Sequence, residues 1–110
     1  MNQPMRSFEE FWPHYLRQHA SPSTRALHYC GVFVALLLLV GMIVLLEPLF
    51  FVGALVAAYA FAWIGHYFFE GNKPATFSHP LWSFMGDIRM FRLWIMGRLD
   101  RELAKAGVQT

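Results

Sequence analysis

Two long stretches without charged residues dominate the pattern of hydrophobic and polar positions along the chain. The first extends from Tyr29 to Leu46 and the second from Leu49 to Phe69. A helix that spans a bilayer needs roughly 17 to 25 mainly apolar residues, so each stretch is long enough to cross a membrane. Only Glu47 and Pro48 separate the two stretches. The pattern therefore predicts two transmembrane helices, at about 29–46 and 49–69, that form a helical hairpin.

The first of these helices has a start signal well before its uncharged part. Ser21 suits the position that caps a helix, and Pro22 suits the first helical position. Small residues recur along both stretches and favour a close approach of the two helices. They are Gly31 and Ala35 in the first stretch and Gly53, Ala54, Ala57, Ala58 and Ala62 in the second.

Amphipathic segments flank the hairpin on both sides. Residues 8–19 follow a capping box at Ser7–Glu10 and carry aromatic side chains at helical spacing, while Pro13 predicts a kink or a later helix start. Residues 80–103 keep an apolar stripe at three- and four-residue spacing, which charged residues between positions 87 and 92 interrupt. Both segments are typical of helices at a membrane interface. For residues 8–19, a surface helix of a soluble bundle is the alternative.

The composition supports the membrane class. Hydrophobic residues make up 56% of the 110 residues and charged residues 15%, whereas about 25% of an ordinary soluble domain is charged. In a soluble bundle, only two amphipathic helices would be available to cover the uncharged faces of both long helices, and two are insufficient for this. We therefore expect one all-α membrane domain over residues 1–110, with the lipid bilayer as its partner. The sequence leaves open whether it forms a homo-oligomer.

Charge and cysteine content exclude several other classes. The net charge of +2, without a basic run interleaved with aromatic residues, argues against a nucleic-acid partner. The single cysteine, Cys30, excludes an internal disulfide and the Cys-rich zinc sites. Basic residues lie before and after the hairpin but not in its turn, so the positive-inside rule predicts that both termini are cytoplasmic.

Polar residues gather at one end of the predicted hairpin. His28 stands 19 residues before Glu47 and His66 stands 18 residues after Pro48. At ~1.5 Å of rise per residue, the two histidines therefore lie at one level. Glu70 is four residues after His66, on the same helix face.

We predict a metal site at this level, because unpaired polar groups are costly near the hydrocarbon. Glu70 would be a ligand or an acceptor for an imidazole N–H. Polar anchoring of each histidine, and a Glu70 that caps the helix and pairs with Lys73, are the simpler alternatives. Such donors suit Fe(II), zinc or manganese, and paired histidines can instead hold haem, so the residues leave this choice open. The predicted ligands are His19, His28, His66 and His79.

Two blocks of the sequence resemble the signature blocks of the Mpo-like family. They are QHASPSTRALHYCG at 18–31 and AWIGHYFFEGNKPATFSHPLWSFMGD at 62–87, and the resemblance covers roughly residues 8–91. Its specific elements are Gly65-His66, Phe69-Glu70 and Pro74-Ala75. The characterised fungal member is a 2-hydroxy fatty acid dioxygenase that shortens the acid by one carbon. The resemblance implies a membrane-embedded, Fe(II)-dependent oxygenase of fatty acid alpha-oxidation. The chain would be a short, bacterial-type member of the family and would lie in the bacterial inner membrane.

For this chain the resemblance implies ligands from both blocks. His19 and His28 come from the first block and His66 from the second, with Glu70 after it, so that His66 and Glu70 carry the catalysis. His79 matches the bacterial-type block, where the fungal pattern departs. The chain is shorter than the fungal form and has fewer apolar spans. A non-catalytic membrane protein that binds metal or haem, for structure or electron transfer, is the alternative function.

The substrates that the resemblance implies are O2 and a 2-hydroxy fatty acid, whose carboxylate and hydroxyl can chelate Fe(II) together. Tyr59, Trp63 and His66 share one helix stripe, which we predict to line the path of the acyl tail. Lys73 and Arg89 are the nearest cations and are predicted to steer the carboxylate, with simple snorkelling to the surface as the alternative.

Overall fold

A computed structural model describes residues 5–73 and 78–108, and every regular element in these ranges is helical. The elements are α1 (Phe8–Arg17), α2 (Pro22–Leu45), α3 (Leu49–Gly65), the π-helix η1 (His66–Glu70), α4 (Pro80–Ile95) and α5 (Leu99–Lys105). The predicted all-α class is confirmed. The chain divides into two compact units, residues 21–73 and residues 1–20 with 74–110, and each is described by itself.

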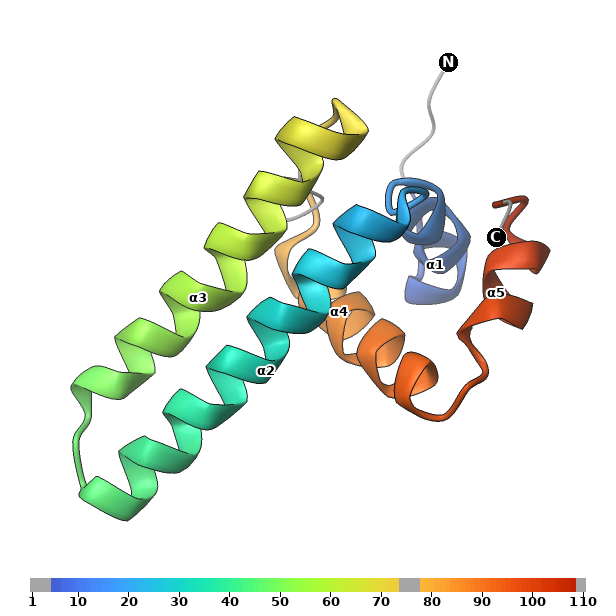
Figure 1. The fold of residues 1–110 in the computed structure, drawn as a ribbon. Helices are drawn as coiled ribbons and strands as arrows, with labels where there is room; N and C mark the ends of the chain where they lie inside the picture. Colours follow the sequence, from blue (N-terminus) through green and yellow to red (C-terminus); the bar gives the residue numbers. More distant parts are fainter. Residues whose placement is uncertain (1–4, 74–77, 109–110) are drawn as a thin grey trace. The chain divides into compact units, whose positions relative to one another are not determined.

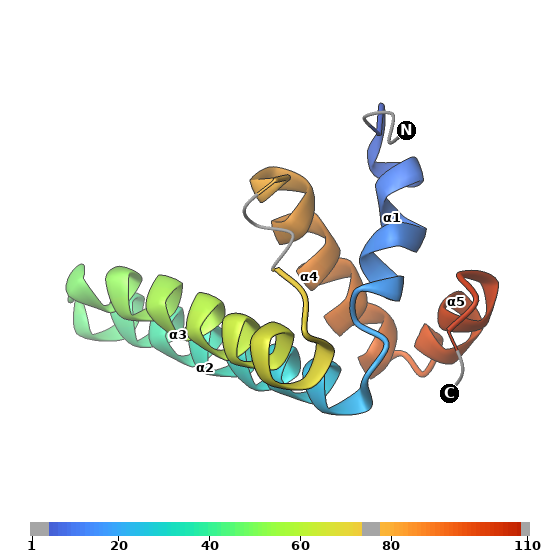
Figure 2. The same cartoon turned by 90° about the horizontal axis from the view of Figure 1, so that it is seen from above.

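The unit of residues 21–73 is a helical hairpin. In Figures 1 and 2, α2 and α3 lie side by side and antiparallel, joined by a short turn. Ser21 caps α2 and Pro22 opens it, as the sequence predicts. At the other end Leu46 is left-handed, with φ of 53°, and the Glu47 N–H reaches back to the carbonyl of Met42 at 3.1 Å. This backbone turn closes α2 and starts α3 three residues later.

Glycines allow the two helices of the hairpin to touch. A Cβ atom added at Gly31 would lie 3.1 Å from the Cβ of Phe61 and 3.3 Å from the carbonyl oxygen of Ala58. At Gly65 it would meet the methyl group of Thr24 at 3.1 Å. Contacts this short would force the neighbouring atoms to shift, so the prediction of a close helix approach at small residues is confirmed at Gly31, and Gly65 adds a second such position.

The outer surfaces of the hairpin are apolar and exposed. Residues 22–45 and 49–70 are long and apolar enough to span a membrane, and only 11% and 22% of their most hydrophobic windows are buried. Val44, Leu49 and Val56 are between 61% and 72% exposed. The core helix of a soluble protein would be mostly buried, and these helices are not.

The second unit packs α1 against α4 and α5. Helix α1 begins at Phe8, with the Ser7 hydroxyl accepting from the Glu10 N–H, and Pro13 lies inside it. Of the two predicted effects of Pro13, the late start is therefore wrong, and the kink stays a prediction. Tyr15 is fully buried, and its ring fills the space beside Gly86, where a Cβ would come within 2.9 Å of it. The Tyr15 hydroxyl donates to Asp87, which explains one charged residue in the apolar stripe of α4.

Two boundaries differ from the sequence prediction. The helix predicted over 80–103 is two helices, because Gly97 is left-handed with φ of 71° and the Arg98 N–H bonds to the carbonyl of Leu93 at 2.9 Å. This pattern is a helix stop that glycine makes at low cost. Helix α1 ends at Arg17, two residues before the predicted end, and leaves His19 outside it. Pro74 and Ala75, one of the specific elements of the sequence resemblance, lie outside the described residues.

Candidate metal centre

His28 and His66 meet at the open end of the hairpin. His28 lies in the second turn of α2 and His66 directly follows α3. Their rings are perpendicular, with centroids 5.1 Å apart, and the two residues are 4% and 1% exposed. The antiparallel arrangement therefore brings them to one level, as their distances from the turn in sequence predicted.

The chain around His66 has an unusual backbone. Residues His66–Glu70 form a π-helix, and the N–H groups of Gly71 and Asn72 both point back to the carbonyl of His66. Gly71 makes the reversal possible with φ of 69°, a conformation that glycine adopts without strain. π-Helical turns are frequent at functional sites. No periodicity in the sequence signals this turn, and the Gly71-Asn72 pair signals only a helix end.

Hydrogen bonds fix which ring nitrogen each histidine of the pair can offer. His28 Nδ1 lies 3.0 Å from the carbonyl oxygen of Thr24, and His66 Nδ1 lies 2.7 Å from Oδ1 of Asn72. A carbonyl oxygen accepts and never donates, so Nδ1 of each ring must carry the proton. In a neutral imidazole the lone pair is then on Nε2, the nitrogen that can ligate a metal. Sequence reasoning missed Asn72.

His19 follows the same rule in its own unit. Its Nδ1 lies 2.6 Å from the carbonyl oxygen of Tyr15, and its ring stacks on that of Tyr15 with centroids 4.1 Å apart. His19 is 1% exposed. Like His28, it donates to the carbonyl four residues earlier and keeps Nε2 for a ligand.

Glu70 holds the beginning of α2. Its Oε1 accepts a hydrogen bond from the backbone N–H of Ser21 at 2.5 Å. A carboxylate at a helix N-terminus satisfies an unpaired N–H and interacts favourably with the helix dipole. The bond therefore ties the end of η1 to the start of α2. Ser21 is two residues after His19, so the backbone of His19 stays within about 8 Å of this anchored point.

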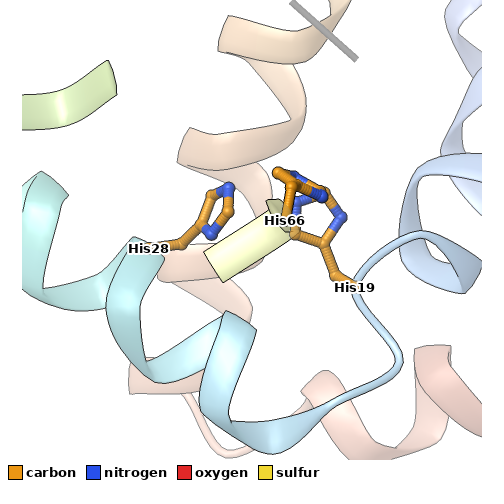
Figure 3. A group of neighbouring side chains, drawn as sticks. All are labelled: His19, His28 and His66. Carbon is orange, nitrogen blue, oxygen red and sulfur yellow. The ribbon is translucent and has the colours of Figure 1, made fainter. Parts of the chain in front are cut away.

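His19, His28 and His66 form a group that can hold a metal ion (Figure 3). All three are buried, and one ring nitrogen from each, Nδ1 or Nε2, lies within 4.8 Å of those of the other two. Three neutral imidazoles leave the charge of a bound cation uncompensated and leave coordination positions open.

Residues 5–99 match the profile of a family described as 2-hydroxy-palmitic acid dioxygenase Mpo1-like. The chain belongs to this family. Curated proteins and solved structures were also compared with the chain, and none matched. The resemblance seen in the sequence blocks is thus confirmed over most of the chain. The family description names a dioxygenase, and a histidine group that can hold a metal ion is compatible with that class of enzyme.

His79, the fourth histidine of the predicted set, is not a member of the group found in the described residues. Its ring stacks on that of Trp82, with centroids 5.3 Å apart and planes 5° from parallel, and its Nδ1 lies 2.9 Å from the Ser78 hydroxyl. A ligand role for His79 stays a prediction.

The cations predicted to steer the substrate differ in their surroundings. The guanidinium of Arg89 lies over the ring of Trp12, 4.6 Å from its centroid, and 3.5 Å from Glu9. Arg89 thus contributes to the packing of α1 on α4, at about 1 kcal/mol for such a contact. Lys73 is exposed, beside the Gly71-Asn72 turn.

Tyr59 and Trp63 lie in an apolar hollow on the surface of α3. The hollow has a volume of about 420 Å³ and is lined by Leu55, Val56, Tyr59, Ala60 and Trp63. The rings of Tyr59 and Trp63 are 6.4 Å apart, one helical turn from each other. Trp63 is three residues before His66, so this stripe of α3 leads from the histidine end of the hairpin toward its turn.

Proposed function

We propose that this protein is a membrane-embedded, non-haem Fe(II) dioxygenase that shortens 2-hydroxy fatty acids by one carbon. The observation that carries the proposal is the buried group of His19, His28 and His66 in a chain of this family. Three hydrogen bonds to oxygen acceptors prepare these rings to present Nε2. In a metal ligand, such a bond fixes the tautomer and the orientation of the ring.

The choice of iron rests on the dioxygenase of the family description, because three imidazoles by themselves also suit zinc or manganese. Structural zinc sites usually include cysteine, and Cys30 is exposed. Fe(II) held by imidazoles supplies a redox-active Lewis acid with open positions for substrate and O2. Glu70, bonded to Ser21, acts by holding α2 in place, and His79 is a candidate for a fourth ligand.

The overall reaction balances without a further reductant. A 2-hydroxy acid and O2 give the acid one carbon shorter, CO2 and H2O: R–CH(OH)–COOH + O2 → R–COOH + CO2 + H2O. The C1–C2 bond breaks, C1 leaves as CO2, and C2 becomes the new carboxyl carbon. Four electrons leave the substrate, and one O2 accepts all four. The protein therefore needs no flavin, nicotinamide or reductase partner.

The hairpin offers a place for each part of the substrate. The hydroxyl and carboxylate would lie at the buried histidines, with the exposed ammonium of Lys73 attracting the carboxylate. The acyl tail would follow the apolar hollow from Trp63 past Tyr59 toward Leu55. Both helices of the hairpin would span the bilayer of a bacterial inner membrane, with the histidine end and both termini on the cytoplasmic side.

Oxygen consumption tests the proposal. Protein purified in detergent and loaded anaerobically with Fe(II) should consume O2 with 2-hydroxypalmitate and release an equal amount of CO2. Palmitate, which enters the same micelles but lacks the hydroxyl for chelation, should give less than about a tenth of that rate. Equal rates with the two acids would contradict the chelation step. No uptake with either acid, together with a Soret band in the purified protein, would favour the haem-binding alternative.

A further inference from the structure

We infer that Asn72 is a positioning residue, which holds His66 in the tautomer and orientation that offer Nε2 to the metal. Asn72 Oδ1 accepts from His66 Nδ1 at 2.7 Å, and the Asn72 backbone N–H donates to the His66 carbonyl at 3.2 Å. Two hydrogen bonds thus join the same two residues, one through side chains and one through backbone. The inference rests on the proposed function only in naming the metal that His66 would serve.

The position of Asn72 depends on the turn before it. Gly71, at φ of 69°, reverses the chain after the π-helix, so that residue 72 faces back toward residue 66. An added Cβ at Gly71 would meet nothing within 4 Å, so the glycine is required for its backbone conformation and not for space. The residues on either side of Gly71 have separate tasks, because Glu70 bonds to Ser21 while Asn72 bonds to His66.

His66 is the member of the group whose orientation is most open to test. His19 and His28 donate to backbone carbonyls one turn earlier in the chain, which no substitution removes. His66 donates to a side chain instead. Outer partners of this kind fix the ring and raise its basicity, and their loss typically lowers metal affinity 10- to 100-fold.

The nature of the acceptor predicts the effect of each substitution. In Asn72→Ala the Nδ1–H of His66 loses its acceptor, and the ring can adopt the Nε2–H form, which cannot ligate through Nε2. In Asn72→Asp a carboxylate oxygen accepts in place of the amide oxygen, and its charge increases the basicity of the ring. Tyr67→Phe is the matched control, because Tyr67 is exposed, lies in the same π-helix and has no assigned role.

The experiment has one readout without metal and one with it. Nitrogen-15 NMR of labelled histidine in the detergent-solubilised, metal-free protein reports the tautomer of His66, whose signals are identified by their loss in His66→Gln. We expect the Nδ1–H form in the wild type, in Tyr67→Phe and in Asn72→Asp, and a shift toward the Nε2–H form in Asn72→Ala. Titration with Co(II), followed by its visible absorption, should show binding roughly 10- to 100-fold weaker in Asn72→Ala and restored in Asn72→Asp.

Two results would overturn the inference. One is an unchanged His66 tautomer in Asn72→Ala. The other is Co(II) binding weakened equally in Asn72→Ala and Asn72→Asp, which would indicate that residue 72 serves only the fold of the turn. Because the NMR measurement requires neither metal nor turnover, it separates a failure of this inference from a failure of the dioxygenase proposal.

Discussion

Each histidine of the candidate metal centre is oriented before any metal arrives. The Nδ1–H groups of His19, His28 and His66 donate to Tyr15, Thr24 and Asn72, at distances of 2.6 to 3.0 Å. A ring already held in its binding orientation loses less conformational freedom when it becomes a ligand. Burial also favours metal binding. A neutral imidazole is less costly to bury than a charged one, and the neutral form is the one that ligates.

Substitution of the ligands should remove the metal. His28→Gln and His66→Gln should each lower the Fe(II) content of anaerobically reconstituted protein by roughly tenfold or more, because each removes one of three imidazoles. Glutamine retains a polar side chain and limits the cavity that alanine would leave. His14→Gln is the control, since His14 is partly buried in α1 and has no part in the predicted site. Iron content equal to the wild type in both variants would exclude these residues as ligands. A loss in His79→Gln would add the fourth ligand.

The gathering of three of the four predicted histidines was predictable at this scale, but the residues that orient them were not. The level of His28 and His66 follows from counting residues along two helices that share a turn. The hydrogen bonds that His66 donates to Asn72 and that Ser21 donates to Glu70 depend on a π-helix and a left-handed glycine. No residue spacing encodes these two features. Glu70 illustrates the difference. Its spacing from His66 suggested a ligand or an acceptor for an imidazole N–H, which stays a prediction, whereas its bond with the Ser21 N–H was not foreseen.

At the scale of elements, the hairpin is held by its small residues as much as by its apolar ones. Helix-to-helix association in a bilayer gains little from the hydrophobic effect, so close packing must supply the attraction. An added Cβ at Gly31 would lie 3.1 Å from Phe61 and 3.3 Å from Ala58, close enough that these neighbours must shift, whereas at Gly53 it would make an ordinary contact with Leu38 at 3.5 Å. These two glycines lie in the same hairpin and differ in the room around them.

The two glycines should therefore respond in opposite directions to alanine. Gly53→Ala should stabilise the hairpin by up to about 1 kcal/mol, because alanine restricts the unfolded backbone and fits its surroundings. Gly31→Ala should destabilise it by about 1–3 kcal/mol, because the added methyl group must push two backbones apart. Unfolding in mixed micelles with increasing SDS, followed by circular dichroism, measures both. A Gly31→Ala protein as stable as Gly53→Ala would show that α2 and α3 do not pack as described.

Long apolar elements were predicted accurately, and short irregular ones were not. The hairpin depends on two long uncharged stretches, Tyr29 to Leu46 and Leu49 to Phe69, whose signals agree, so an error at any one position changes little. The stop at Gly97 depends on one glycine and two backbone hydrogen bonds, within an apolar stripe that continues through it. An isolated glycine in such a pattern is compatible with a continuous helix, and tertiary packing decides.

At the scale of the whole molecule, the exposed apolar residues and the positions of the basic residues are the two features that favour a membrane environment. The hairpin exposes large apolar residues along most of its length, and α4 in the other unit exposes Leu81, Phe84 and Ile88, at 49% to 68%. Exposed surfaces of this kind are unstable in water unless something covers them. The basic residues flank the hairpin and avoid its turn, and by the positive-inside rule this distribution predicts cytoplasmic termini.

Labelling of single cysteines can test this orientation. In a Cys30→Ser background, Leu49→Cys places a thiol on a 72% exposed position beside the turn, and Ala104→Cys places one on the exposed surface of α5. With the protein in the inner membrane of intact spheroplasts, a membrane-impermeant maleimide should label Leu49→Cys and not Ala104→Cys. After permeabilisation both should react, which controls for the reactivity of each thiol.

The reversed pattern would show that the termini face outward and that the histidine end lies on the opposite side. Labelling of neither variant in spheroplasts, with recovery of the protein in the supernatant after lysis and ultracentrifugation, would contradict membrane insertion itself, because a spanning hairpin cannot leave the bilayer without detergent.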